Sequence, residues 1–117
     1  MQTQTIDNRP WGHYVVLFDC ESCKVKKIVV EPDQRLSYQY HEKRSEVWTV
    51  IQGVATVTLD DKKIIILPGY TISIPQGAKH RVQNDETEPL VFIEVQTGTY
   101  FGEDDIVRLE DDYDREV

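Results

Sequence analysis

Short runs of apolar and polar residues follow one another along this chain, with turn residues between them. Alternation is clearest in Ala55-Thr56-Val57-Thr58-Leu59, the pattern of a strand with one buried face. Asp60-Asp61 predicts a tight hairpin, and Pro68-Gly69 and Pro75-Gln76-Gly77 predict further turns. We therefore predict strands at His13–Phe18, Lys24–Glu31, Leu36–Tyr40, Glu46–Gln52, Val54–Leu59, Lys62–Leu67, Thr71–Ile74, His80–Gln83 and Leu90–Gln96.

Many short strands with no long helical period predict an all-β fold, an antiparallel sandwich or barrel. The 117 residues suit one domain over 1–117, because no internal repeat or low-complexity linker divides them. The tail from Gly102 to Arg115 is expected to form a short helical or extended arm.

Charge and hydropathy narrow the possible partners and location. The net charge is −8, with many of the acidic residues in the tail, so we expect no nucleic acid and no anionic membrane as a partner. A pocket with local Arg and Lys can still hold an anionic metabolite. The first ten residues are polar, and no apolar run approaches the ~20 residues of a membrane span. The expected location is cytoplasmic.

Two segments about forty residues apart carry possible metal ligands. Gln39 and His41 lie two residues apart, so on a strand they share a face. Glu46 follows at the start of the next extended run, and His80 opens a later strand after a Pro-x-Gly turn. Two imidazoles, a carboxylate and an amide oxygen suit a divalent cation with positions left for substrate. Zinc is the expected ion, with manganese, cobalt, iron and nickel as alternatives.

Other polar side chains have two possible placements. Arg44 shares a face with Glu46 if the strand already begins there, and would then steady an oxyanion or clamp a phosphate beside the metal; otherwise it is a surface residue. Glu94 alternates with apolar neighbours, so it either faces solvent or lies in the cavity as a proton-transfer group. Trp48 either fills the core or forms a stacking wall for a sugar.

Cys20 and Cys23 form a Cys-x-x-Cys motif between two predicted strands. Zinc knuckles and redox pairs use this spacing. No second cysteine pair is present in the sequence, so we interpret the motif as an incidental pair at a hairpin tip.

The two ligand segments resemble the two cupin motifs. In the first, Asp33 stands where the family has Gly and Gln39 where it has the first His, while His41, Glu46 and Gly53 match. The second motif is matched throughout, by Gly69, Pro75, Gly77, His80 and Asn84. This resemblance implies the cupin form of an all-β fold, a double-stranded β-helix or jelly-roll.

Nearly the whole chain also resembles the type II phosphomannose isomerase domain, the C-terminal part of bifunctional mannose-1-phosphate guanylyltransferase/mannose-6-phosphate isomerase proteins. The segments that carry this resemblance are Arg9-Pro10-Trp11-Gly12, Leu36-Ser37-x-Gln39-x-His41, Arg44-x-Glu46-x-Trp48, Ile74-Pro75, His80, Ile93-Glu94-Val95-Gln96-x-Gly98 and Glu103 to Tyr113. The family usually has a His-rich stretch where this chain has Glu42 and Lys43, and often His where it has Val47. The ligand positions are kept. The sequence has no Gly-rich nucleotide loop, so nucleotidyl transfer is not expected of it.

The resemblance implies interconversion of mannose 6-phosphate and fructose 6-phosphate through a cis-enediolate. In that reaction a metal acts as Lewis acid, Glu94 is the candidate base, and Arg44 stabilises negative charge or orients the substrate. Candidate phosphate or substrate contacts are Arg35, Trp48, Lys79, Arg81 and Arg108. We also expect a homodimer that hides exposed strand edges.

Two alternatives remain from the sequence. One is a non-catalytic cupin that binds a sugar or metabolite, favoured by Glu42 and Lys43 in place of the His-rich stretch. The other is a different cupin enzyme, such as a dioxygenase. A dioxygenase more often has a His-rich iron site, so Gln39 argues against it.

Overall fold

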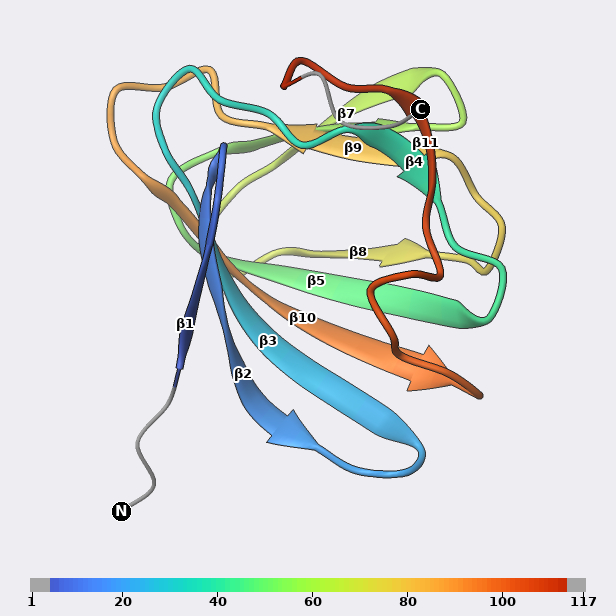
Figure 1. Cartoon of the computed structure of the whole chain (residues 1–117). Helices are drawn as coiled ribbons and strands as arrows, with labels where there is room; N and C mark the ends of the chain where they lie inside the picture. The colour runs from blue at the N-terminus through green and yellow to red at the C-terminus, as the bar shows by residue number, and fades with distance from the viewer. Residues whose placement is uncertain (1–4, 114–117) are drawn as a thin grey trace.

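The computed structural model describes residues 5–113 of the chain, and regular structure within this range consists of strands. They form two antiparallel sheets that face each other (Figure 1). The six-stranded sheet has the order β1-β2-β3-β10-β5-β8, and the five-stranded sheet the order β11-β4-β9-β6-β7. The strands are β1 (Ile6–Arg9), β2 (Gly12–Asp19), β3 (Cys23–Val30), β4 (Tyr38–Tyr40), β5 (Arg44–Gln52), β6 (Ala55–Leu59), β7 (Lys62–Ile66), β8 (Thr71–Ile74), β9 (His80–Gln83), β10 (Leu90–Gly98) and β11 (Val107–Glu110).

The all-β prediction is confirmed, and each of the nine predicted strands is present, most with ends shifted by one or two residues. Two strands were not predicted individually. β1 pairs with β2 across the turn at Pro10 and Trp11, and β11, within the expected C-terminal arm, pairs with β4. No helix among the described residues is long and apolar enough to cross a membrane.

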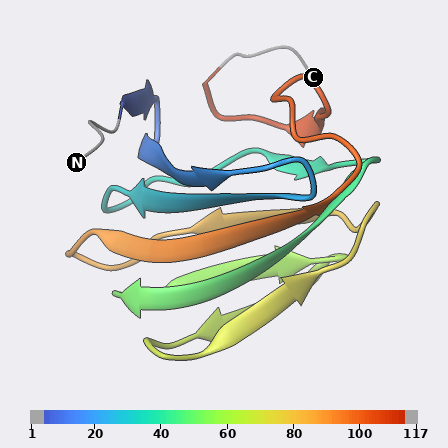
Figure 2. The ribbon, with the colours of Figure 1, turned by 90° about the horizontal axis from the view of Figure 1, so that it is seen from below.

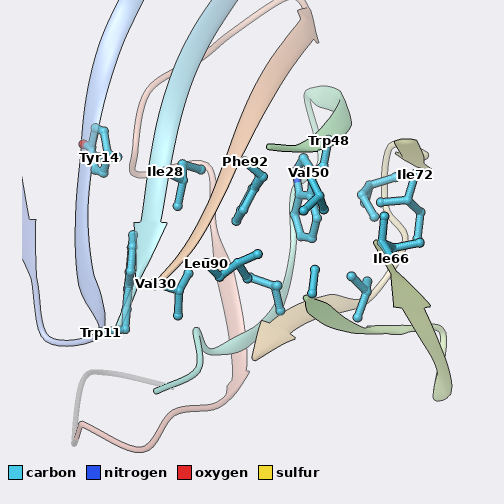
Figure 3. Packing of buried hydrophobic residues seen from close by; sticks show 14 of the residues in the cluster. Trp11, Tyr14, Ile28, Val30, Trp48, Val50, Ile66, Ile72, Leu90 and Phe92 are labelled. Atoms are coloured by element: carbon cyan, nitrogen blue, oxygen red, sulfur yellow. The ribbon is translucent and has the colours of Figure 1, made fainter. Parts of the chain in front are cut away.

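The inner face of the larger sheet has an apolar end and a polar end, because cross-strand pairing places similar residues in the same row. Figure 2 shows β2, β3, β10 and β5 side by side in that order. Ile28, Phe92 and Val50 are cross-strand partners, so their side chains lie on one face of the sheet. They pack in the core between the sheets with the other apolar side chains labelled in Figure 3. The apolar end supplies the packing that holds the two sheets together.

Two residues further along the same strands, the inward positions become polar. Lys26, Glu94 and Trp48 are partners across β3, β10 and β5. In the next row Gln96 is the partner of Glu46. All five side chains are buried. Buried ionisable groups are costly unless they are paired, so this end of the sandwich is the place to look for chemistry.

Gly98 ends β10 directly beside the chain that leads into β5. It has φ +153, and a Cβ there would overlap the backbone oxygen of Lys43 and lie 2.9 Å from Arg44 Cα. We expect Gly98→Ala to lower the free energy of unfolding by about 1–3 kcal/mol, because backbone must move to relieve the overlap. Thermal denaturation followed by circular dichroism measures this. Gly69→Ala is the matched control, since Gly69 also has positive φ but a Cβ there meets nothing within 4 Å. Equal melting temperatures for the two variants would contradict the prediction.

The two cysteines lie at the turn between β2 and β3, as predicted. Both are free and partly exposed, and their Sγ atoms are 3.0 Å apart. The hydrogen bond between the thiols lowers the pKa of Cys20 and raises that of Cys23. They are not among the residues that line the cavity described below.

Candidate metal centre

Three of the predicted ligands come together between the two sheets. His41 directly follows β4, Glu46 lies near the start of β5, and His80 is the first residue of β9. Their side chains are 4%, 2% and 1% exposed. One potential ligand atom from each lies within 4.8 Å of the other two. The Nε2 atoms of His41 and His80 are 3.3 Å and 3.8 Å from the two carboxylate oxygens of Glu46.

Backbone carbonyls orient both imidazoles for metal binding. His80 Nδ1 is 2.9 Å from the oxygen of Ala78, and His41 Nδ1 is 2.6 Å from the oxygen of Asp105. A carbonyl only accepts, so each Nδ1 donates and each Nε2 carries a lone pair, which in His41 faces the Arg44 guanidinium at 3.2 Å. His80 Nε2 is buried and has no hydrogen-bond partner among the described residues. An orphaned acceptor beside a carboxylate fits a divalent cation, and carbonyl partners of this kind hold metal-binding histidines in place.

The charge states also fit a cation. Burial lowers the pKa of His41, which favours the neutral imidazole that a metal requires. Burial opposes ionisation of Glu46, but the charges of the two histidine rings, when protonated, and of the Arg44 guanidinium outweigh it and lower its pKa to about 2. The group therefore offers two imidazole nitrogens and one ionised carboxylate, a donor set typical of zinc and related ions.

Gln39 lies beside this group. It is the cross-strand partner of His80, is buried, and lines the same cavity. The hydroxyl of Ser37 donates to its Oε1 at 3.1 Å, which orients the side-chain amide. A carbonyl oxygen has a second lone pair, so Oε1 can still serve as a ligand. Its role as the fourth ligand stays a prediction.

Arg44 belongs to the site rather than to the surface. β5 begins at Arg44, so this residue shares the inner face with Glu46, and its side chain is buried. Its Nε donates to Glu46 Oε2 at 2.9 Å, and one terminal nitrogen lies 3.2 Å from His41 Nε2. The other terminal nitrogen, Nη1, is buried without a hydrogen-bond partner among residues 5–113. Arg44 thus places a positive charge and a free donor beside the metal ligands.

Glu94 lies inside the cavity, and the solvent-facing alternative is excluded. Its side chain is 5% exposed and accepts a hydrogen bond from the Gln96 amide. The indole Nε1 of Trp48 lies 3.1 Å from Glu94 Oε2 and 3.0 Å from Glu46 Oε1, so one N–H bridges the two carboxyl groups. Burial and the charge of Glu46 raise the pKa of Glu94 to about 8. A cation bound at Glu46 would lower it, because it would offset that charge.

Trp48 fills the core and also lines the cavity, while its use as a stacking wall for a sugar stays a prediction. Its ring packs 5.0 Å from that of Phe92 in the core and 5.6 Å from that of His80. It also forms part of the cavity wall. The ring is thereby fixed, and its N–H holds the spacing of Glu46 and Glu94.

A cavity of about 70 Å³ opens from this group and continues toward β1, β2 and β3. Arg108 lines it, as do Arg9, Lys26 and Glu103, which the sequence analysis did not select as site residues. On β3, Lys26 is two and four residues from Ile28 and Val30, so its side chain points inward as theirs do. This spacing is the feature of the sequence that could have identified Lys26 as a cavity residue. The walls are formed by Arg9, Trp11, Tyr14, Lys26, Ile28, Leu36, Ser37, Gln39, His41, Arg44, Glu46, Trp48, Glu94, Glu103, Ile106 and Arg108.

The other predicted cations lie elsewhere. Arg35 makes two hydrogen bonds to Asp112, of 2.6 Å and 2.9 Å, on the surface. The side chain of Lys79 is exposed. Arg81 is buried, but its Nε donates to the backbone oxygen of Leu36 at 3.0 Å. None of the three is among the residues that line the cavity.

The facing sheets and the buried His-Glu-His group define a cupin with a candidate metal centre. Residues 1–111 match the family described as mannose-6-phosphate isomerase C-terminal, and the chain belongs to this family. Known structures support the fold. The capsular polysaccharide assembling protein CapF from Staphylococcus aureus has a TM-score of 0.80 at 18% identity, over 94% of this chain and 35% of that one. A Klebsiella pneumoniae protein with a double-stranded β-helix domain has a TM-score of 0.72 at 22% identity, over 81% and 76% of the two chains.

Curated relatives are proteins of sugar and polysaccharide biosynthesis. The chain is 45% identical over 107 residues to the xanthan biosynthesis protein XanB of Xanthomonas campestris pv. campestris, covering 92% of this chain and 23% of that protein. It is 47% identical over 107 residues to the alginate biosynthesis protein AlgA of Pseudomonas aeruginosa, covering 92% and 22%. The chain thus spans less than a quarter of the length of these relatives.

Proposed function

We propose that this domain is a metal-dependent aldose–ketose isomerase that interconverts mannose 6-phosphate and fructose 6-phosphate, with zinc as its metal. The observation that carries the proposal is a second buried carboxyl, Glu94, beside the His41, Glu46 and His80 group. His41, Glu46 and Glu94 line one cavity. A module that only binds metal needs the His41, Glu46 and His80 group but no second buried carboxyl. A buried carboxyl with a raised pKa beside it suits proton transfer. The family to which the chain belongs supports the choice of substrate.

Each side chain has a place in this chemistry. The isomerisation removes a proton from the carbon next to the carbonyl, passes through a cis-enediolate, and returns the proton to the neighbouring carbon. Gln39, His41, Glu46 and His80 would hold a divalent cation, which would supply Lewis-acid stabilisation of negative charge. Glu94, in its carboxylate form, takes the proton and gives it back, while the Trp48 N–H holds its Oε2 in position. Arg44, paired with Glu46 through its Nε, places a positive charge near the oxygen on which negative charge develops.

The departures from the family pattern do not touch the cavity. Glu42 and Lys43 are exposed, and their backbone N–H groups bind the carboxylate of Asp105 at 3.1 Å and 3.0 Å. Val47 is exposed on the outer face of β5. None of these three residues lines the cavity. Glu42 and Lys43, which favoured a non-catalytic binding cupin, therefore lie on the surface of the described structure.

A coupled assay distinguishes an isomerase from a binding module. Metal-stripped protein is given zinc, cobalt, manganese or nickel in turn, and formation of fructose 6-phosphate from mannose 6-phosphate is followed. We expect no turnover without metal and restored turnover with zinc. Stoichiometric zinc binding with no turnover under any metal would instead support the binding cupin. Turnover restored only by another ion would overturn the choice of zinc.

A further inference from the structure

We propose that Lys26, Arg9 and Arg44 form a phosphate-binding subsite, and that the Glu103 carboxylate occupies it until a phosphorylated ligand displaces it. The inference rests on the proposed function and deepens it, because it assigns the cavity end opposite the metal ligands to the substrate's phosphate. All four side chains line the one cavity.

Lys26 is the centre of this subsite. Its side chain is 4% exposed, and its Nζ lies 2.9 Å from Glu103 Oε2 and 4.1 Å from the centroid of the Tyr14 ring. A buried ammonium is costly without an anionic partner. Arg9 contacts the same ring: it donates to the Tyr14 hydroxyl at 3.1 Å, with its guanidinium carbon 5.3 Å from the ring centroid. Its Nε is also paired with Asp7 Oδ1 at 3.2 Å. Two cations thus meet around one aromatic ring.

Glu103 pairs with Lys26 but does not satisfy the other donors around it. Its Oε2 also lies 3.9 Å from Arg44 Nη1, an ion pair too long for a hydrogen bond. Arg44 Nη1 has no hydrogen-bond partner within the described part of the chain, although it is buried. A phosphate has three terminal oxygens, so it can bind Lys26 and the unpartnered Arg44 donor at the same time. A phosphate dianion therefore fits this end of the cavity better than the carboxylate does.

The position of Glu103 makes it displaceable. It lies in the non-strand segment between β10 and β11, and its side chain is 47% exposed while that of Lys26 is not. Lys26 offsets the effect of burial and holds the pKa of Glu103 below its usual value, so the displaced group is a carboxylate that water can solvate.

The spacing suits a sugar phosphate. Lys26 is on β3 and Glu46 on β5, with β10 between them and a two-residue offset in register, so their backbones are roughly 12 Å apart. In a hexose 6-phosphate the phosphate is at the opposite end of the carbon chain from the reacting carbonyl. With the carbonyl at the metal ligands, the phosphate points toward β3. Arg44 lies between the two ends and contacts both Glu46 and Glu103.

Calorimetric titration of the full chain with inorganic phosphate tests the subsite without requiring turnover. Variants are Lys26→Met, Glu103→Gln and the control Lys27→Met, whose side chain is exposed on the opposite face of β3. We expect Lys26→Met to weaken phosphate binding by roughly tenfold or more, since it removes a charged hydrogen bond. Glu103→Gln is expected to tighten binding by a similar factor because it removes the competing charge. Lys27→Met is expected to bind as the unmodified chain does.

The outcomes separate the subsite from the isomerase. One outcome is that the unmodified chain turns over mannose 6-phosphate while Lys26→Met and Glu103→Gln leave phosphate affinity unchanged. This would overturn the subsite and leave the isomerase intact. The expected affinity pattern without turnover would support the subsite and count against the isomerase. Absence of phosphate binding in the folded Glu103→Gln variant, checked by thermal denaturation, would also overturn the subsite.

Discussion

Replacing His80 with alanine is expected to abolish stoichiometric zinc binding and mannose 6-phosphate turnover together. His80 is 1% exposed, and its Nε2 lies 3.8 Å from Glu46 with no hydrogen-bond partner among residues 5–113. Its Nδ1 is held by the oxygen of Ala78, so the ring cannot rotate away without breaking that bond. Loss of a metal ligand should weaken zinc binding by at least about 100-fold, since even changes to residues that only support a ligand cost up to that much.

Metal content after gel filtration and competitive titration against a chelator measure this effect. His13→Ala is the matched control, because His13 is the one histidine outside the metal group. It should retain zinc and turnover. Wild-type zinc affinity in a folded His80→Ala variant would contradict the assignment of this ligand.

Replacing Glu94 with glutamine is expected to reduce turnover by about 10²–10⁴-fold while zinc affinity changes little. The glutamine carbonyl can still accept the hydrogen bond from Trp48, so the indole should stay in place. The variant cannot take up a proton as a carboxylate does. Steady-state kinetics should show the loss in kcat rather than in KM, because Glu94 acts on the reacting carbons and not on the phosphate.

A Lys26→Met variant provides the contrast for this prediction. Lys26 is the cross-strand partner of Glu94 but is assigned to phosphate, so its loss should appear mainly in KM. A Glu94→Gln variant with undiminished kcat would exclude Glu94 as the proton-transfer group.

The strand pattern was predictable because most strands have one face in the core. Val57, for instance, has no exposed surface and lies in the strand where alternation is clearest. β1 escaped prediction because its residues, Ile6 to Arg9, are mostly polar and partly exposed. β1 is held in place by pairing with β2. Such pairing depends on both segments and cannot be inferred from the residues of one of them.

The His41, Glu46 and His80 group was also predictable, because these residues stand at matching positions of the two cupin motifs. The anionic subsite was not, because it depends on contacts between distant segments. Lys26 and Glu103 are 77 positions apart and meet only when the segment after β10 passes over the cavity. Arg35 and Lys79 were plausible from their place near motif residues, yet the fold directs Arg35 to Asp112 instead. Local spacing therefore identifies ligands on one strand better than it identifies the far end of a cavity.

Proton NMR of the zinc-loaded chain with mannose 6-phosphate in deuterated water tests the central claim most directly. We expect fructose 6-phosphate signals to appear and deuterium to enter at carbon 1, because the proton held by Glu94 exchanges with solvent at the enediolate stage. Mannose 6-phosphate signals that persist unchanged after prolonged incubation with zinc-loaded protein would contradict the isomerase.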